Sequence, residues 1–345
     1  MYNEQRPSSI IPGGFGSGSL KQLGELEVIR IIERSLGTNQ RTVVGFGDDV
    51  SAVRLAKHQV AVLKTDMLVG STDVPPGMSM RQTARKAVVA NVSDLAAKGA
   101  RPFAGIVALG LPTRLTRRDV MEIAAGLAGG AKEYGFPLVG GDTNESNDLV
   151  ISIALFALMD DRRIILRSGA RLGDVVAVTN DFGNASAGLK ALLERRIRPD
   201  TLPPALAKAV YRPRAELELG VKLASSGAVS ASIDSSDGLA WSLHELAKMS
   251  KVGIQVQHVP ISKAAKQFAF SCGYNATDLA LYGGEEYNLV VTVRPNQFRI
   301  AQRAVRGRLK PIGVVTPRTR GVRLVTNEHE IKIAMKGWEH FRRQK

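Results

Sequence analysis

The amino-acid sequence predicts a two-domain α/β protein with some α+β character. The chain has 345 residues, which is more than the usual length of one domain. Short apolar segments typical of buried strands alternate with longer segments of helical periodicity. One order of features, a strand, then acidic and small residues, then a helix, occurs in the first half of the chain and again in the second. We therefore expect two α/β units, each with acidic residues at one edge of its sheet.

The composition is that of a basic globular protein, with a net charge of +15 and 44% hydrophobic residues. A positive charge of this size attracts polyanions, which include nucleic acids and phosphorylated small molecules. The basic residues are spread along the chain, most densely in residues 294–323, without interleaved aromatic residues that could stack bases. We therefore do not expect nucleic acid to be a partner, and we interpret the charge as a generally basic, solvated surface.

The cysteine content and the hydropathy indicate the compartment. The single cysteine, Cys272, excludes a disulfide framework and a cysteine-rich zinc site, and it favours the reducing cytosol. No apolar segment approaches the ~20 residues needed to cross a bilayer, and the N-terminus lacks the basic-then-apolar order of a signal peptide. Residues 1–19, which contain GGFGSGS, are typical of a flexible tail. We expect a cytoplasmic protein without a membrane partner.

The N-terminal domain is predicted for residues 20–160. Residues 20–36 carry apolar side chains at helical spacing and end at Gly37, as a helix does. Residues 80–99 form the strongest helix signal in the chain, with Ser79 as its N-cap. The other expected elements are strands at 42–46, 59–63, 103–109, 137–139 and 149–159 and a helix at 119–134.

The C-terminal domain is predicted for residues 161–345, because the polar segment 160–173 separates two cycles of strands and helices. After a strand at 174–179, the turn NDFGNASAG enters a helix whose free N–H groups could bind phosphate. The alternative is a simple turn with Asn184 or Ser186 as the N-cap. The remaining expected elements are strands at 229–233 and 254–259 and a helix at 239–249.

Acidic residues follow the first two predicted strands. Asp48-Asp49 comes after the strand at 42–46, and Lys64, Thr65 and Asp66 come at the end of the strand at 59–63. If these strands pair, carboxylates ~4 Å apart repel one another by roughly 4 kcal/mol at an effective dielectric of about 20. Hard oxygen ligands that need a cation suit magnesium with nucleotide phosphates. The alternative is a pair of solvated aspartates in a turn.

Further acids occupy comparable positions. In the helix at 80–99, Asn91 and Asp94 lie one turn apart on one stripe, where the alternative is an ordinary solvent-facing acid. Asp142 follows Gly140 and Gly141 at the predicted end of the strand at 137–139. The whole set that we expect around several magnesium ions comprises Asp48, Asp49, Asp66, Asp94, Asp142, Asp234 and Asp237.

The chemistry of this set points to ATP. Because it contains no histidine or cysteine, zinc is excluded as the natural metal. The sequence also lacks the G-x-x-x-x-G-K-[ST] phosphate loop. An acid-lined site for several metal ions without that loop favours ATP-dependent phosphoryl transfer through positioning and charge neutralisation.

These motifs resemble those of the thiamine-monophosphate kinase family over roughly residues 20–341. Its superfamily includes aminoimidazole ribonucleotide synthetase, selenophosphate synthetase and a hydrogenase maturation factor. The resemblance implies their two-domain fold, with an N-terminal mixed sheet with helices and a C-terminal α/β domain that completes the active site. The matching segments, in order, are GFGDDVSAV, KTDMLVGSTDVPPGM, AVVANVSDLAAKGARP, LVGGDTNES, LRSGARLGD, DSSDGLAWSL, YGGEEYNL and KGWEHF.

The resemblance implies direct in-line transfer of phosphate from ATP to thiamine monophosphate, with magnesium, in a homodimer joined through the N-terminal sheets. It leaves open whether K⁺ is also required. It assigns Asp142 and Asp237 to catalysis. It assigns the metal site to Asp49, Thr65, Asp66, Asp94, Asp142, Asp234 and Asp237, and we add Lys64 to that site. It assigns ATP contacts to Gly141, Asp142, Arg167 and Ser236, and substrate contacts to Asp73, Glu285 and Trp338.

The sequence departs from the family pattern near the acceptor. Asp73 stands where bacterial members carry histidine, and Lys64 stands where the family has serine or another small residue. Family Asp-Tyr-Glu after the G-G-E motif is replaced by Glu286-Tyr287-Asn288. Two alternatives therefore stay open: an ATP-dependent kinase or synthetase for another small acceptor, and a non-catalytic basic binding protein on the same fold.

Overall fold

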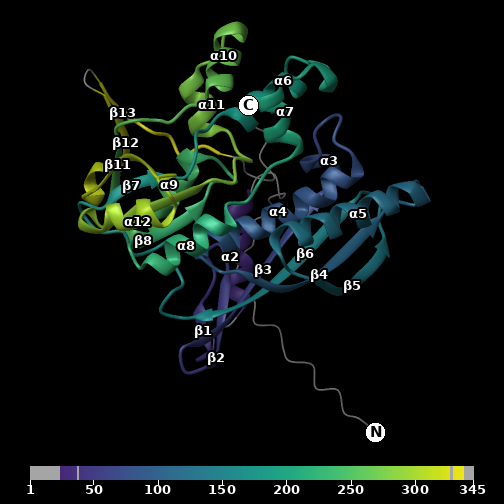
Figure 1. The fold of residues 1–345 in the computed structure, drawn as a ribbon, viewed down its shortest axis with the longest axis horizontal. Helices are drawn as coiled ribbons and strands as arrows, with labels where there is room; N and C mark the ends of the chain where they lie inside the picture. Colours follow the sequence, from purple (N-terminus) through teal and green to yellow (C-terminus); the bar gives the residue numbers. More distant parts are fainter. Residues whose placement is uncertain (1–23, 37–38, 327–328, 338–345) are drawn as a thin grey trace, which may run out of the picture. The chain divides into compact units, whose positions relative to one another are not determined.

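The computed structural model describes residues 24–36, 39–326 and 329–337 (Figure 1). Helix α2 (Glu25–Ser35) belongs to a compact unit separate from Thr38–Trp338 and is considered by itself. The helix predicted at 20–36 is thus confirmed over Glu25–Ser35, and the tail and Trp338 lie outside the described residues. Among the described helices, none combines the length and the apolar character that a bilayer crossing requires.

The first sheet has six strands in the order β1-β2-β3-β6-β4-β5. Only β4 and β5 pair in parallel, and the other neighbours are antiparallel. Alternation along β3 and β6 places Val60, Val62, Ile151 and Ile153 on one buried face. The strands are β1 (Thr42–Val44), β2 (Ser51–Ala56), β3 (Gln59–Val69), β4 (Pro102–Leu111), β5 (Leu138–Glu145) and β6 (Val150–Asp160).

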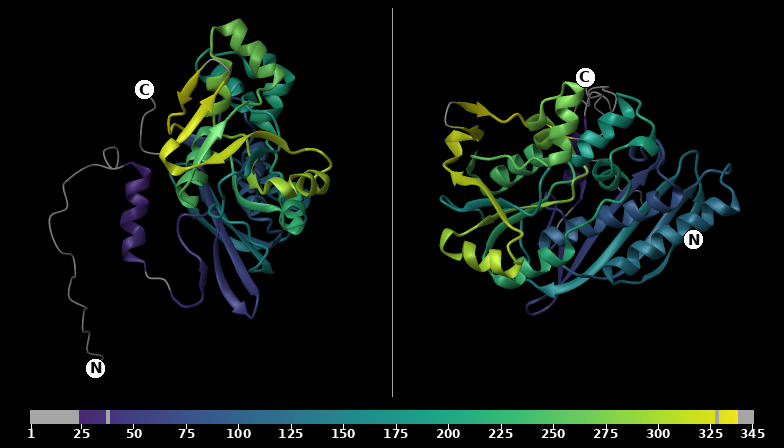
Figure 2. Two further views of the ribbon diagram at one scale, coloured as in Figure 1. Left: turned by 90° about the vertical axis from the view of Figure 1, so that its left-hand side faces the viewer. Right: turned by 45° about the horizontal axis from the view of Figure 1, so that its top comes forward.

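Helices α4 (Met80–Lys98) and α5 (Arg117–Tyr134) cover that buried face, and the right-hand view of Figure 2 shows them side by side. Ser79 caps α4 through a capping box with Gln82, as the sequence predicts, and the helix ends at Gly99 in the left-handed conformation. Asn91 and Asp94 of the predicted stripe are both buried, so a solvent-facing Asp94 is excluded. The short helix α3 (Gly70–Asp73) follows β3.

The second sheet has seven strands in the order β13-β12-β9-β11-β7-β10-β8. Only β12 and β9 pair in parallel. Its strands begin fifteen positions after β6 ends, beyond the polar segment 160–173. They are β7 (Val175–Val178), β8 (Val229–Asp234), β9 (Gly253–Val256), β10 (Leu289–Val293), β11 (Lys310–Thr316), β12 (Val322–Val325) and β13 (Glu330–Lys332).

Helices cover both faces of the second sheet. Alternate residues along its strands point to opposite faces, and the two sets pack into two different cores. Val176 and Val290 pack in the core that contains α9, whereas Ala177 and Val291 pack in the core that contains α4 and α8. The helices of this half are α6 (Asn184–Leu193), α7 (Pro204–Tyr211), α8 (Leu217–Ser226), α9 (Leu239–Ser250), α10 (Lys263–Cys272), α11 (Ala276–Tyr282) and α12 (Phe298–Ala304). Single 3₁₀ turns lie at Pro199–Thr201, Pro295–Gln297 and Arg318–Arg320.

Helix α4 joins the two sheets. It packs on β3 and β6 on one side and against α8 and β8 on the other. Gly220 of α8 permits this close approach, since a Cβ there would lie 1.9 Å from the Ala96 carbonyl oxygen. At the end of α4, Lys98 Nζ donates a 2.8 Å hydrogen bond to Ser232 O of β8. Residues near the end of α4 are therefore held between the two halves of the protein.

One strand of the first sheet was not predicted, and two predicted strand ends are wrong. β2, which the sequence analysis did not predict, lies between β1 and β3, so the first two predicted strands do not pair. β3 continues through Lys64, Thr65 and Asp66, because these residues keep their register with β6 as far as Val69. β5 likewise continues past Asp142 to Glu145. These acids therefore lie within strands and not at strand ends. Helices α7, α8, α10, α11 and α12 were also not predicted.

Candidate active site

The Asp48-Asp49 pair lies in the turn between β1 and β2 and is neutralised by two cations. Lys98 Nζ lies 2.6 Å from Asp48 Oδ1 and 2.7 Å from Asp49 Oδ2. Arg167 Nε donates to Asp49 Oδ1 at 2.8 Å, and the Arg167 backbone N–H donates to Asp48 Oδ2 at 2.9 Å. The Oδ2 atom of Asp49, although close to Lys98, accepts no well-directed hydrogen bond. Solvent-exposed turn aspartates are thereby excluded.

A second ion pair connects the first sheet to α4. Lys64 and Asp66 are two positions apart on β3, so both side chains project from the face that α4 covers. Lys64 Nζ lies 2.7 Å from Asp94 Oδ2 and 3.5 Å from Asp66 Oδ1. Burial alone would lower the pKa of Lys64, but the Asp94 and Asp66 carboxylates raise it above its ordinary value. Lys64 is therefore a cation at neutral pH.

Asp234 brings the second half of the chain to the same place. It ends β8, and its carboxylate accepts hydrogen bonds from Ser93 Oγ at 2.6 Å and Ser236 Oγ at 3.2 Å. Carboxylate oxygens of Asp49, Asp94 and Asp234 all lie within 4.8 Å of one another. The predicted convergence of acids from both halves is confirmed for these three residues, which we call the buried acid cluster.

The pKa values of the buried acid cluster reflect desolvation and mutual repulsion. Burial and then the Asp49 charge raise the pKa of Asp234 to about 6. Burial also raises the pKa of Asp94 well above its ordinary range, with Lys64 opposing the shift. For Asp49, burial would raise the pKa, but Lys98 and Arg167 hold it below the ordinary value. An additional positive charge nearby would therefore stabilise the ionised forms of Asp94 and Asp234.

The residues of this cluster fit a magnesium ion. Around it, Asn91 Oδ1 and Ser235 Oγ are buried oxygens without a hydrogen-bond partner, and each such atom costs about 1–3 kcal/mol. Asn91 lies one turn before Asp94, and its Nδ2 donates to Ala87 O at 3.0 Å. Ser235 directly follows Asp234. A set of carboxylate oxygens, with unpartnered buried oxygens on residues that neighbour it in the chain, is what a hard divalent cation requires.

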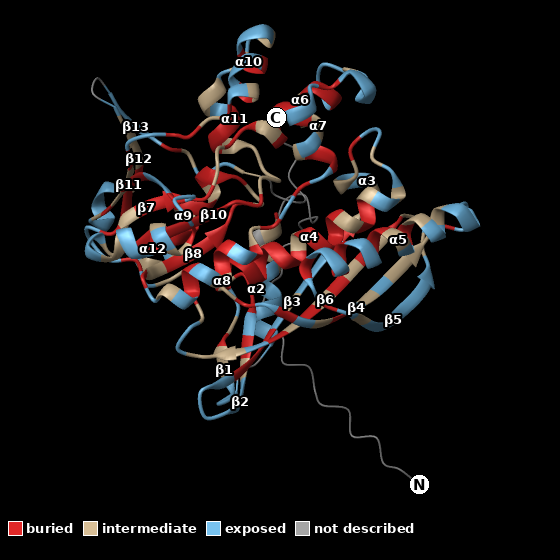
Figure 3. Cartoon of the chain, in the orientation of Figure 1, coloured by how far each residue is buried: buried red, intermediate tan, exposed pale blue. Residues whose placement is uncertain are grey.

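Thr65 and Asp142 do not join the buried acid cluster. Strand alternation directs Thr65 to the face opposite Lys64 and Asp66. The register places Asp142 beside Ala108 of β4, on that same open face, with β4 and β6 between it and β3. Figure 3 shows β5 almost entirely exposed. The expectation that the aspartates meet in one cleft is therefore wrong for Asp142, and the predicted metal residue Thr65 also faces away from the cluster.

Gly141 and Asp142 instead line a cavity of about 320 Å³ on the first sheet. A Cβ at position 141 would lie 1.8 Å from the Val107 carbonyl oxygen, so only glycine fits there. Most of the other residues that line this cavity are apolar: Ile106, Val107, Ala108, Ser152 and Ala154.

Asp73 and Glu285, the predicted substrate residues, meet at a buried lysine that the sequence analysis did not single out. The Asp73 carboxylate accepts a hydrogen bond from the Val69 backbone N–H at 2.7 Å. The backbone carbonyl oxygen of Asp73 accepts one from Lys86 Nζ, also at 2.7 Å. Lys86 Nζ also pairs with the Glu285 carboxylate. The Asp73 carboxylate is thus occupied in capping the end of β3. The position of Lys86 in the sequence could have indicated burial, because it lies within a helix that is otherwise rich in alanine and valine.

The D-S-S-D-G turn links this region to the buried acid cluster. The Glu285 backbone N–H donates to Ser236 O at 2.6 Å. Glu285 itself has a φ of 65°, a strained left-handed conformation for a residue with a side chain. Asp237 is half-buried in the same turn, before α9. Ser236, Asp237 and Glu285 are therefore held close to Asp234 by backbone contacts.

The N-terminus of α6 is filled by a side chain of the protein. Glu286 accepts the backbone N–H groups of Gly183 at 2.7 Å and Ala185 at 3.0 Å. Burial raises the pKa of Glu286 to about 7, against the opposing effect of these hydrogen bonds. Gly183 is the N-cap, so the alternative of Asn184 or Ser186 as the cap is wrong, and the N–H groups proposed for phosphate already have an acceptor.

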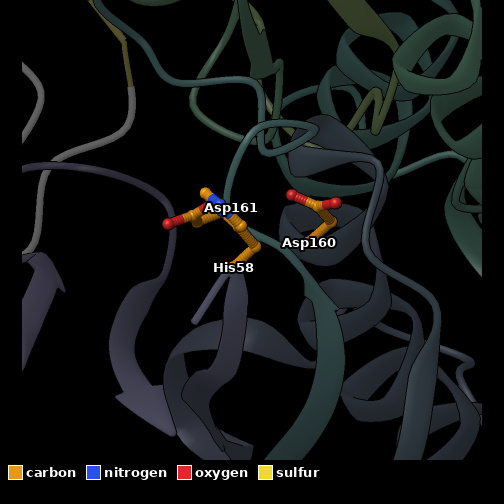
Figure 4. Close-up of side chains that lie close together, drawn as sticks. All are labelled: His58, Asp160 and Asp161. Carbon is orange, nitrogen blue, oxygen red and sulfur yellow. The ribbon is translucent and has the colours of Figure 1, made fainter. Parts of the chain in front are cut away.

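A second group of metal-type side chains lies elsewhere in the first sheet. His58 in the β2–β3 turn, together with Asp160 and Asp161 at the end of β6, forms what we call the surface acid cluster (Figure 4). Arg54 Nη1 lies 2.6 Å from Asp161 Oδ2, and Arg162 Nε donates to Asp160 Oδ1 at 2.9 Å. Each of its two carboxylates therefore already has an arginine.

Comparison with known proteins identifies the family. Residues 47–159 match the model of the AIR synthase related protein, N-terminal domain. The chain is 36% identical to the thiamine-monophosphate kinase of Nitrosopumilus maritimus, over 94% of this chain and 100% of that protein. The chain belongs to the thiamine-monophosphate kinase family. The family member from Pyrococcus abyssi is 35% identical, over 86% of this chain and 90% of that protein.

Solved structures agree with this thiamine-monophosphate kinase assignment. The structure of AaThiL complexed with AMPPCP and TMP superposes with a TM-score of 0.80 at 29% identity, over 94% of this chain and 99% of that chain. Hydrogenase maturation protein HypE in complex with ATP superposes with a TM-score of 0.67 at 21% identity, which shows the shared fold alone. The family and the two-domain α/β fold that the sequence motifs implied are therefore confirmed.

Proposed function

We infer that this protein is a thiamine-monophosphate kinase, which uses ATP to convert thiamine monophosphate to thiamine diphosphate. The observation that carries this inference is the convergence of Asp49, Asp94 and Asp234 from both halves of a chain that belongs to this family. AaThiL, which has the same fold over nearly the whole chain, was obtained with AMPPCP and TMP bound. A site for a nucleotide and a thiamine phosphate on this fold therefore has a precedent.

The chemistry requires positioning more than proton transfer. The acceptor is an ionised phosphate, so no general base has to remove a proton before in-line attack. When bound, Mg²⁺ at Asp49, Asp94 and Asp234 would neutralise charge on the triphosphate. We propose that Asp66 and Asp237 complete this metal site, with Lys64 at its edge. We also propose that Arg167, whose guanidinium pairs with Asp49 here, contacts phosphate when the nucleotide is bound.

We assign the acceptor to the region of Asp73, Glu285 and Lys86. Glu285 suits a cationic or amino heterocycle, and Lys86 supplies the positive charge that a phosphate near Asp73 needs. Trp338, outside the described residues, stays a proposed thiamine contact. Gly141, Asp142 and Ser236 stay proposed ATP contacts, with Asp142 and Asp237 as proposed catalytic residues and Thr65 as a proposed metal residue.

We also propose a cytosolic homodimer joined through the open face of the first sheet. This face carries exposed apolar side chains on strands β3, β4 and β5, and a patch of this kind marks an interaction surface. A second copy there would cover the cavity beside Gly141 and Asp142. The residues are Leu63, Met67, Phe103, Ile106 and Val139. Light scattering should then report a dimer for the intact chain and a monomer for Met67→Lys.

The decisive experiment measures ADP release and thiamine diphosphate formation with Mg²⁺, ATP and thiamine monophosphate. Unphosphorylated thiamine and a reaction without acceptor serve as controls, and omission of K⁺ tests its requirement. We expect ADP release to depend on thiamine monophosphate and to match the diphosphate formed. Equal ADP release without acceptor would instead favour a kinase or synthetase for another small molecule. No turnover together with tight binding of a polyanion would favour the non-catalytic binding protein.

A further inference from the structure

Lys64 places a permanent positive charge inside the proposed metal site. Its side chain is 15% exposed, and it projects from β3 toward α4. The ammonium contacts Asp94 at 2.7 Å and Asp66 at 3.5 Å, which come from two different elements. A divalent cation that bridges two carboxylates would occupy the same space between them.

The charges around this position can be counted from the contacts. Five carboxylates face three cations, which leaves two negative charges. Glu245, 3.9 Å from Arg167, has its own partner in Lys248 at 2.9 Å. Asp237 lies in the following turn, and we assign its metal contact to an ion that arrives with the nucleotide, so its charge is not part of this count. The carboxylates are Asp48, Asp49, Asp66, Asp94 and Asp234, and the cations are Lys64, Lys98 and Arg167.

Of the two uncompensated charges, one lies at Asp234, and the other is shared by Asp66 and Asp94, which have only Lys64 between them. Among the described ion pairs, Asp49 has Lys98 and Arg167, and Asp94 has Lys64, whereas Asp234 has hydrogen bonds from serine hydroxyls but no ion pair. The unsatisfied hydroxyl of Ser235 is adjacent to Asp234 in the chain. A group of side chains with a net charge of minus two, and with such an oxygen beside its one carboxylate without an ion pair, matches one divalent cation.

We propose that Lys64 takes the place of one divalent cation, so that the nucleotide-free protein binds a single such ion, at the Asp234 side of the buried acid cluster. Lys64 is then a positioning residue that holds Asp94 and Asp66 without a metal between them. The inference rests on the proposed function only in that it takes this cluster to be the metal site. It follows that removal of the Lys64 ammonium leaves space between Asp66 and Asp94 and leaves both carboxylates without a cation, so that a second ion can bind there.

Titration of the nucleotide-free, full-length protein with Mn²⁺ tests this proposal, followed by calorimetry and by the loss of the free-ion paramagnetic resonance signal. We expect one tightly bound Mn²⁺ in the wild type and in Lys64→Arg, and two in Lys64→Met. Lys310→Met is the matched control, because Lys310 pairs with Asp181 at 2.7 Å on the surface. It should bind one ion.

Two or more tight ions in the wild type, or no additional ion in Lys64→Met, would overturn the proposal. The wild-type stoichiometry decides the question even if Lys64→Met does not fold. The measurement requires no turnover, so a protein that binds one Mn²⁺ and lacks kinase activity would refute the proposed function and leave this inference standing. In addition, Mg²⁺ should raise the unfolding temperature of Lys64→Met by more than that of Lys64→Arg.

Discussion

The buried and the surface acid clusters contain similar groups at similar spacing but differ in surroundings. The buried acid cluster draws its carboxylates from the β1–β2 turn, α4 and β8, whereas the surface acid cluster draws its side chains from one turn and the end of one strand. Burial raises the pKa of Asp94 and Asp234, whereas hydrogen bonds from arginine lower the pKa of Asp160 and Asp161. Proximity of acids alone therefore does not identify a metal site.

The difference lies in what satisfies each negative charge. At the surface acid cluster, the arginines Arg54 and Arg162 satisfy the carboxylates. At the buried acid cluster, fixed cations serve Asp49 and Asp94, but Asp234 has only hydroxyl donors, and two nearby oxygens have no partner. A buried site that remains short of positive charge can select a metal ion, since an ion is the remaining source of compensation.

The largest effect that we expect is the loss of kinase activity in Asp94→Asn. This change removes a metal-site carboxylate but retains the shape of the side chain, so the turnover number should fall by about 10³-fold or more, with the fold intact. Asp160→Asn in the surface acid cluster is the control and should turn over like the wild type. Coupled ADP release and circular dichroism measure both. Near-normal turnover of Asp94→Asn would remove the distinction between the clusters.

The second prediction concerns stability. Lys98→Met removes a fully buried cation that serves both Asp48 and Asp49, so it should lower the free energy of unfolding by about 3–5 kcal/mol. Urea unfolding followed by circular dichroism measures the change. Saturating Mg²⁺ should restore part of the loss, because the two carboxylates are then again opposed by positive charge. A loss below about 1 kcal/mol would mean that the buried pairs resemble surface pairs.

The sequence predicted the helix that carries this site better than it predicted which of the side chains on that helix are buried. Helix α4 was readable because Ser79, the valine stripe and Gly99 agree with one another. That Asp94 is buried could not be read, because α8 and β8, which cover this end of α4, come more than one hundred residues later. Lys86 and Lys98 look like solvated helix residues until Glu285 and Asp48 are placed beside them.

Strand parity explains why Thr65 and Asp142 were misplaced. A residue on a strand faces one side or the other according to register, and a shift by one position reverses the face. The sequence suggested that β3 and β5 end before these residues, and beyond the end of a strand the alternation no longer determines which way a side chain points. In the structure, pairing with β6 extends β3, and pairing with β4 extends β5. The polar segments KTD and GGDTNE gave no indication that the strands continue through them.

The third prediction uses the raised pKa of Asp234. The folded-state pKa of about 6 exceeds the ordinary value of 3.8, so this group stabilises the metal-free protein below pH 4, and that contribution is lost as the pH rises through 6. Mg²⁺ binding requires the ionised form and adds about 2.7 kcal/mol at one hundred times its dissociation constant. Mg²⁺ should therefore raise the unfolding temperature by clearly more at pH 8 than at pH 5.

Two variants connect this effect to one cluster. Asp234→Asn should abolish the Mg²⁺-dependent rise at pH 8, whereas Asp161→Asn should retain it. The same rise in both variants, or a rise at pH 5 as large as at pH 8, would assign the metal to a different place.

The smallest effect should come from the arginines of the surface acid cluster. In the double variant Arg54→Met/Arg162→Met, the carboxylates of Asp160 and Asp161 lose their partners but remain accessible to water. Because hydration replaces these exposed ion pairs, the urea midpoint and the turnover number should stay within error of the wild type. Mn²⁺ stoichiometry should also stay unchanged, because hydrated carboxylates gain little from an ion. An extra tight Mn²⁺ in this variant would show that arginine pairing, and not burial, separates the two clusters.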